Sequence, residues 1–263
     1  MNKVIGFDRR LQLGWLDATA GLCQATLDPD VVSERLWQRL ELEIAGTEAR
    51  RKTRTVLLRI WVKVPREHRR LRGEALQLAA QIGSEESLWL HWGMSLLAYP
   101  FFRDVAATVG QLSRLQGTFS QAQVQRRMIE NWGQRTTLRR AVQRLLRTFV
   151  DWGALRDTDV RGRYDVAPRR QTENRTLALW LLDCALHAND AEQVPLRELG
   201  QLSYTFPFDV LPFVNDVRLS ERFEVARQGL DLEMVAASMT TEGALRRGNT
   251  DVVSPIPKTL SNK

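Results

Sequence analysis

Residues 135–153, RTTLRRAVQRLLRTFVDWG, combine many arginines with an otherwise largely apolar stretch. They contain five arginines, no lysine and one acidic residue. A guanidinium group is planar and presents a fixed fork of donors, so it can bind phosphate oxygens or the edge of guanine through two hydrogen bonds at once. The stretch therefore predicts binding of an anionic polymer. The residues expected to take part are Arg135, Arg139, Arg140, Gln143, Arg144 and Arg147.

The apolar residues of this stretch predict the element that positions the arginines. They recur at intervals of four and three positions and share one face of a helix over 137–152: Leu138, Val142, Leu145, Phe149 and Trp152. That face must be buried against neighbouring helices. The arginines then form a second stripe, which we expect to project outward.

The residues before this helix predict a second helix and a tight turn. Ser120 and Gln123 fit a capping box at its start, and Gly133 fits the position just after its end. A helix, a short turn and a charged second helix are the parts of a helix-turn-helix, whose second helix enters the major groove of DNA. The sequence therefore predicts a recognition helix at 137–152.

The residues after this helix predict a β-hairpin. Residues 154–166 contain two short strand-like runs, separated by the turn-forming residues 157–162. A hairpin in this place is a wing, and Arg161 and Arg163 are expected to contact the DNA backbone or the minor groove. Residues 100–168 are accordingly predicted to form a winged helix-turn-helix.

A second interpretation of the arginines is a solvated surface, because arginine-rich amphipathic helices are common and genomic bias also favours arginine. Arginine outnumbers lysine by 33 to 5 in the whole chain. The distribution of charge argues for a directed surface, however. Residues 118–170 hold 12 basic and 5 acidic residues, and their net charge of +7 equals that of the entire chain.

Another basic block lies upstream, at residues 50–72 of ARRKTRTVLLRIWVKVPREHRRLRG. Arg50, Arg51 and Arg54 fall in the first turns of a predicted helix over 47–62, where cations oppose the helix dipole. This local conflict suggests a use beyond stability. We expect these three arginines to extend a phosphate track, although a solvated surface explains them equally well.

The chain as a whole, 263 residues with 43% hydrophobic residues, predicts a mainly α-helical fold in three parts. Helical periodicity predicts an N-terminal bundle within residues 1–99, followed by the winged helix-turn-helix at 100–168. Residues 169–238 predict a C-terminal α+β unit with a hairpin near Gln228, and this unit could be a second winged-helix-like unit. Residues 239–263 are predicted to be a disordered tail.

The C-terminal unit differs from the other parts in charge. Residues 171–240 hold 5 basic and 11 acidic residues, a net charge of −6. Direct contact with DNA is therefore not expected there. Docking of another protein is one expectation, and simple packing onto the rest of the chain is the other.

The sequence does not predict an enzyme. His68, His91 and His187 lie apart from one another, and neither Cys23 nor Cys184 has a metal-binding spacing. We find no nucleotide-cradling loop and no nucleophile elbow, so no catalytic residue, cofactor or metal is expected. The absence of a signal-peptide pattern and of a spanning apolar run predicts a soluble cytoplasmic protein without a membrane partner.

The central region resembles the BrxA family of BREX (bacteriophage exclusion) defence systems. The resemblance covers roughly residues 30–166. It is carried by LWLHWGMSLLAYPFFRDVAATVGQLSRLQGTFSQAQVQRRM, with its Phe102-Arg103-Asp104 step, and by RRAVQRLLRTFVDWGAL. The resemblance implies an all-helical protein with a winged-helix part that binds DNA and is not an enzyme. The additional C-terminal unit departs from the family pattern.

These observations lead us to expect a non-enzymatic, double-stranded-DNA-binding accessory component of a BREX-like phage-defence system, with other defence proteins as further partners. Three alternatives stay open. The winged helix could belong to a transcriptional regulator, the basic residues 50–72 could bind RNA, or the basic faces could make the protein a scaffold that docks acidic partners.

Overall fold

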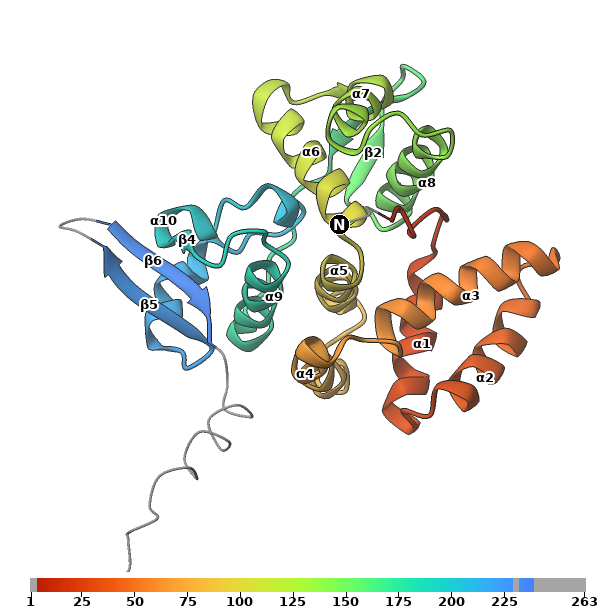
Figure 1. The fold of residues 1–263 in the computed structure, drawn as a ribbon, viewed down its shortest axis with the longest axis horizontal. Coiled ribbons are helices and arrows are strands. Elements are labelled where there is room, and N and C mark those ends of the chain that lie inside the picture. The colour runs from red at the N-terminus through yellow and green to blue at the C-terminus, as the bar shows by residue number, and fades with distance from the viewer. Residues whose placement is uncertain (1–3, 229–231, 239–263) are drawn as a thin grey trace, which may run out of the picture.

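The computed structural model describes residues 4–228 and 232–238. The predicted tail at 239–263 lies outside the described residues. The described chain is mainly helical, with two small antiparallel sheets. Figure 1 shows the elements in three groups, with helices α4 and α5 of the first group in the middle of the view.

The first group is the predicted N-terminal bundle. Its α-helices are α1 (Leu13–Ala25), α2 (Pro29–Glu41), α3 (Thr47–Trp61), α4 (Arg69–Ala79) and α5 (Ser87–Ala98), with a 3-10 turn η1 (Arg66–His68) before α4. Helix α2 begins directly after Asp28, whose side chain accepts hydrogen bonds from the amides of Asp30 and Val31. Helix α5 starts after Glu86 without a side-chain cap.

The second group contains the predicted helix pair and hairpin. Its elements are α6 (Pro100–Gln116), β1 (Phe119–Ser120), α7 (Gln121–Trp132), α8 (Leu138–Asp151), β2 (Leu155–Asp157) and β3 (Arg163–Val166). The three strands are antiparallel in the order β1-β3-β2, with Phe119 opposite Tyr164 and Leu155 opposite Val166. The capping box of Ser120 and Gln123 is present, which confirms that prediction.

The third group also contains a three-stranded antiparallel sheet, and its strand order matches that of the second group. Its elements are α9 (Arg175–His187), β4 (Val194–Pro195), α10 (Leu196–Leu199), the 3-10 segments η2 (Ser203–Thr205) and η3 (Leu211–Leu219), β5 (Phe223–Gln228) and β6 (Leu232–Ala237). The sheet order is β4-β6-β5, so the final strand again lies in the middle. The predicted hairpin is confirmed in its strands.

Helix α5 joins the three groups. Every residue from Leu88 to Ala98 is buried, as expected for a helix with other elements on all sides. Trp92 packs against Phe102 and Phe149, at ring-centroid distances of 4.9 Å each, and its indole nitrogen donates to the carbonyl of Tyr204. The three predicted units therefore share one continuous hydrophobic core.

Candidate nucleic-acid interface

Helix α8 buries its apolar face as the spacing of its residues predicts. Leu138, Val142, Leu145 and Phe149 are fully buried, and Trp152 just beyond the helix is 1% exposed. Arg139, Arg140 and Gln143 are exposed on the other side. Their side chains form no hydrogen bond or ion pair with any residue in the described ranges 4–228 and 232–238.

The two arginines in the C-terminal half of α8 are held by the protein itself. Arg144 donates a 2.7 Å hydrogen bond to the carbonyl of Asp8, and its guanidinium lies 3.8 Å from the Asp8 carboxylate. Arg147 donates to both carboxylate oxygens of Asp157, at 2.6 and 2.7 Å, and this pairing raises the pKa of Arg147. The expectation that both guanidiniums project freely into solvent is therefore wrong.

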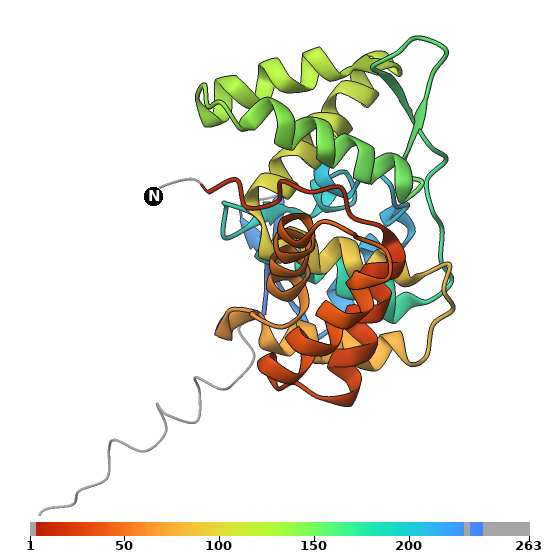
Figure 2. The same cartoon turned by 90° about the vertical axis from the view of Figure 1, so that its right-hand side faces the viewer.

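The partner of Arg144 belongs to an N-terminal segment, residues 4–12, that the sequence did not predict. Figure 2 shows this segment passing between α8 and α3. The amide of Leu11 donates to Thr148 Oγ1, and Trp152 Nε1 donates to the carbonyl of Leu11, each at 3.0 Å. Arg10 pairs with Asp151. These contacts cover one side of the C-terminal half of α8.

Buried side chains anchor the same segment on the bundle. Phe7 is fully buried and packs edge-on against Tyr99, with 5.3 Å between ring centroids. Gly6 adopts φ +61°, and a Cβ there would lie 2.8 Å from the Tyr99 ring, so a glycine is needed for the close approach. The alternation of apolar residues in VIGF was the available signal, but the segment forms no regular element that periodicity could predict.

The hairpin after α8 presents Arg161 and Arg163 to solvent, as expected. Gly162, with φ +78°, closes its turn, and the carbonyl of Gly162 accepts a 2.8 Å hydrogen bond from the amide of Gln121 at the start of α7. The tip of the hairpin is therefore fixed beside α7. Arg156 on β2 is a further exposed arginine that could add to this surface.

The arginines of α3 divide into two sets. Arg50 is only 6% exposed, donates to Glu41 and to the carbonyl of Ile44, and stacks on Trp37 at 4.6 Å. Arg54 stacks on the same ring at 4.8 Å. Both arginines are thus directed toward α2, and the expectation that they extend a phosphate track is wrong for Arg50 and unsupported for Arg54.

Arg51 and Arg135 line one cleft, which Arg50 and Arg54 do not line. Arg51 is exposed and pairs with Glu48 one turn away, at 2.9 Å. Arg135 is exposed in the turn before α8, and it lines the same cleft as Arg51. The structure therefore brings cations of both predicted basic blocks to a common surface.

The histidines and cysteines lie elsewhere. His91 is buried, with Nε2 2.8 Å from Asp17, and burial lowers its pKa. Burial raises the pKa of Cys23 to about 11 and that of Cys184 well above its ordinary value, so both thiols are protonated at neutral pH. Among the described residues, no group of His, Cys, Asp and Glu is arranged to hold a metal ion.

In the same part of the chain, no helix is both long and apolar enough to span a membrane.

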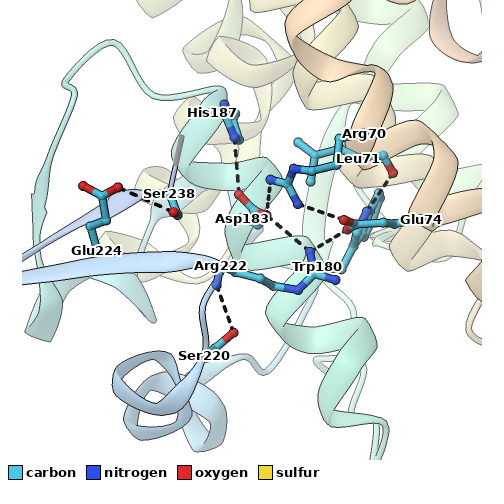
Figure 3. Close-up of polar contacts among 10 residues, drawn as sticks. All are labelled: Arg70, Leu71, Glu74, Trp180, Asp183, His187, Ser220, Arg222, Glu224 and Ser238. Atoms are coloured by element: carbon cyan, nitrogen blue, oxygen red, sulfur yellow. Dashed lines mark hydrogen bonds and ion pairs between the residues drawn. The ribbon is translucent and has the colours of Figure 1, made fainter. Parts of the chain in front are cut away.

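A partly buried ion cluster joins the bundle to the C-terminal group (Figure 3). Asp183 on α9 is fully buried and lies 2.9 Å from Arg70 of α4 and 3.4 Å from Arg222, which precedes β5. Glu74 binds the same two arginines, at 2.9 and 2.5 Å. Two carboxylates and two guanidiniums thus compensate one another. His187 adds a third contact to Asp183, at 3.4 Å.

Comparisons of the chain with protein-family models, with curated protein sequences and with solved structures find no significant match. The resemblance to BrxA proteins stays a prediction from the sequence.

Proposed function

We propose that this protein binds double-stranded DNA through residues 100–168, folded as a winged helix-turn-helix, and that it does so without catalysing a reaction. The order of elements, α6-β1-α7-α8-β2-β3, supports the proposal. So does the three-stranded sheet in the order β1-β3-β2, which places a hairpin directly after the arginine-rich helix. In this arrangement α8 is the recognition helix and the β2–β3 hairpin is the wing.

The proposal depends mainly on the exposure of polar side chains in the N-terminal half of α8. Arg139, Arg140 and Gln143 are exposed and have no partner among the described residues, while the face behind them is fully buried. Recognition helices contact base edges mainly through their N-terminal residues. Arginine suits guanine and glutamine suits adenine, each through a pair of hydrogen bonds.

Arg144 and Arg147 have a different role in this proposal. Arg144 ties α8 to Asp8 and Arg147 ties it to Asp157 at the end of β2, so they hold the helix against the N-terminal segment and the hairpin. On the wing, Arg161 and Arg163 supply the contacts with the DNA backbone or the minor groove.

The resemblance to BrxA supports a setting for this binding. In that setting the protein is a cytoplasmic accessory component of a BREX-like defence system, and the acidic residues 169–238 dock other defence proteins. Genes for a methyltransferase, a large ATPase and a phosphatase-like protein beside its own gene would support this setting. Co-purification with the products of such genes, unaffected by nuclease, would test the docking.

The test of DNA binding is a mobility shift with duplex DNA at several salt concentrations. If about six phosphates are neutralised, log K falls with log salt at a slope of about −5. Arg139→Ala with Arg140→Ala should weaken binding at least about tenfold, since a good bidentate contact contributes about 1–3 kcal/mol. Lys63→Ala with Arg66→Ala, two exposed cations on the bundle, is the matched control and should leave binding unchanged.

Three results would contradict the proposal. One is the absence of a shift with duplex DNA, and another is a shift that does not respond to salt. The third is stronger competition by structured RNA than by duplex DNA, which would favour the RNA-binding alternative. An Arg147→Ala variant separates the two halves of α8, because it should affect binding much less than loss of Arg140 does.

A further inference from the structure

A cleft with a volume of about 520 Å³ lies where the two basic blocks of the sequence meet. One wall is α3, which contributes Arg51, Lys52 and Thr55. The opposite wall is the turn before α8, which contributes Arg135 and Thr137. The N-terminal segment forms the third side, with Val4, Ile5, Gly6 and Asp8. Residues more than 80 positions apart in the sequence thus line one space.

The charge of this cleft is positive. Three cationic residues, Arg51, Lys52 and Arg135, line it together with one acid, Asp8. The Asp8 carboxylate lies 3.4 Å from Arg9 and 3.8 Å from Arg144, so it is paired with arginines that do not line the cleft. A cleft with this lining attracts anions.

The cations of α3 are available to a ligand. Lys52 is exposed and forms no ion pair or hydrogen bond through its side chain with the part of the chain that the structure describes. Among the described residues, the Arg51 side chain pairs with Glu48 alone, and both side chains are more than half exposed. An exposed pair on one helix is weak, so a phosphate can replace Glu48 at little cost.

The position of the cleft relative to α8 indicates which anion it holds. Thr137 lines the cleft and is the residue just before α8, so Arg139 and Arg140 follow within the next turn. The hairpin follows the other end of α8, and its tip is bound to the start of α7. A recognition helix in the major groove has a phosphate backbone on each side. The cleft therefore lies at the N-terminal end of α8, and the hairpin begins at its C-terminal end.

We infer that this cleft binds the phosphodiester backbone of the duplex that α8 reads, with Arg51 and Lys52 as the phosphate contacts on the bundle. The helical bundle then takes part in DNA binding, and the bound duplex extends from the wing across α8 to α3. This inference rests on the proposed function, so its test must separate loss of the cleft contacts from loss of α8 recognition.

The test compares Arg51→Ala with Lys52→Ala, as a double variant, with the control double variant Lys63→Ala and Arg66→Ala. The control removes equal charge near the other end of α3, about 16 Å from Lys52 at 1.5 Å per residue. Loss of two phosphate contacts should reduce the salt slope of log K by about 1.8. The control should keep the wild-type slope. All four side chains are exposed, so thermal unfolding should show that both variants fold normally.

Three outcomes decide the matter. A reduced slope for the cleft variant alone supports the inference. An unchanged slope for that variant, together with weak binding by the Arg139→Ala and Arg140→Ala variant, overturns the cleft contacts and leaves the proposed function standing. If neither the cleft variant nor the Arg139→Ala and Arg140→Ala variant changes DNA binding, the cleft contacts and the proposed function are both overturned.

A second measurement places the cleft on the DNA. The native thiols are buried, so a Lys52→Cys variant can be labelled at that position alone with an iron chelate that cleaves nearby DNA. Cleavage should occur at one flank of the site that α8 protects. Cleavage spread evenly along the duplex, or none, would contradict the inference.

Discussion

Residues 100–168 and residues 169–238 follow the same plan, in which a helix and a short strand precede further helical segments and a hairpin. The strand order is also the same, β1-β3-β2 in the first and β4-β6-β5 in the second. Their arginines nevertheless have different surroundings. Arg139 and Arg140 of the first unit are without partners among the described residues, whereas Arg218 and Arg222 of the second bind Glu233 and Glu74, each at 2.5 Å.

The segments before the two hairpins differ as well. In the first unit this segment is the 14-residue α-helix α8, and in the second it is the nine-residue 3-10 segment η3, which contains Pro212. A 3-10 segment has poorer hydrogen-bond geometry and cannot present a regular α-helical face to a groove. The comparison teaches that one order of strands can accompany a regular α-helix with exposed arginines in one unit and a 3-10 segment with paired arginines in the other.

The largest effect that would sharpen this comparison concerns the ion cluster of the second unit. Asp183→Ala removes the fully buried member of the cluster and leaves Arg70 and Arg222, which are 32% and 22% exposed, with Glu74 among the described residues. Breaking a fully buried ion pair costs about 3–5 kcal/mol, and the partial exposure of both guanidiniums puts the expected loss at the lower end of that range. Urea denaturation should show this loss. Asp190→Ala, which removes an exposed partner of Arg103, is the control and should change stability much less. Equal effects of the two variants would show that the cluster does not hold the second unit in place.

The next effect concerns the contact between the two units. A Cβ on Gly110 of α6 would lie 2.0 Å from the backbone oxygen of Ser203, so Gly110→Ala should lower the free energy of unfolding by about 3 kcal/mol. Gly73→Ala in α4 is the control, because nothing lies within 4 Å of that position. It should raise stability by about 0.5–1 kcal/mol. A neutral Gly110→Ala would mean that the units are not packed together as described.

The smallest effect is a response to pH. Burial lowers the pKa of His91 and of His68, so below about pH 6.5 the unfolded chain takes up protons that the folded chain does not. Stability should therefore fall between pH 7.5 and 5.5, by at most about 1.4 kcal/mol per pH unit for each histidine. The pKa of Asp17 is lowered, so that carboxyl titrates below this window.

Two measurements check this prediction. His91→Asn should make unfolding less dependent on pH, as measured by urea denaturation at several pH values. Residues 100–168 contain no histidine, so affinity for duplex DNA should be the same at pH 7.5 and pH 6.5. An affinity that rises as the pH falls would indicate that histidines outside residues 100–168 contact the DNA. It would then contradict the expectation that residues 100–168 bind DNA and residues 169–238 do not.

Sequence periodicity predicted the elements of the candidate interface well, because α7, α8 and the hairpin carry strong local signals. The apolar face of α8, the Ser120 cap and Gly133 each depend on neighbours within a few residues. The sequence could not predict in the same way which arginines are exposed and which are bound by other residues of the protein. Arg144 is bound by Asp8, 136 positions away, and a pairing over that distance leaves no local pattern.

The same limit applies to α3 and to the cleft. Arg50 and Arg51 are neighbours in the sequence, yet one is stacked on Trp37 and the other is exposed. The surroundings of the two side chains differ because α2, which carries Trp37, packs against the side of α3 where Arg50 lies. The sequence predicted two basic blocks, but their meeting at one cleft follows from the path of the N-terminal segment between them.

That path has a consequence for synthesis of the chain. Leu11 emerges from the ribosome long before Thr148 and Trp152, which lie 137 and 141 positions later. At about 5–20 residues per second, the delay is about 7–28 s. During that time Phe7 and Leu11 lack part of their final surroundings, so the start of the nascent chain can dock onto α8 only after α8 has been made.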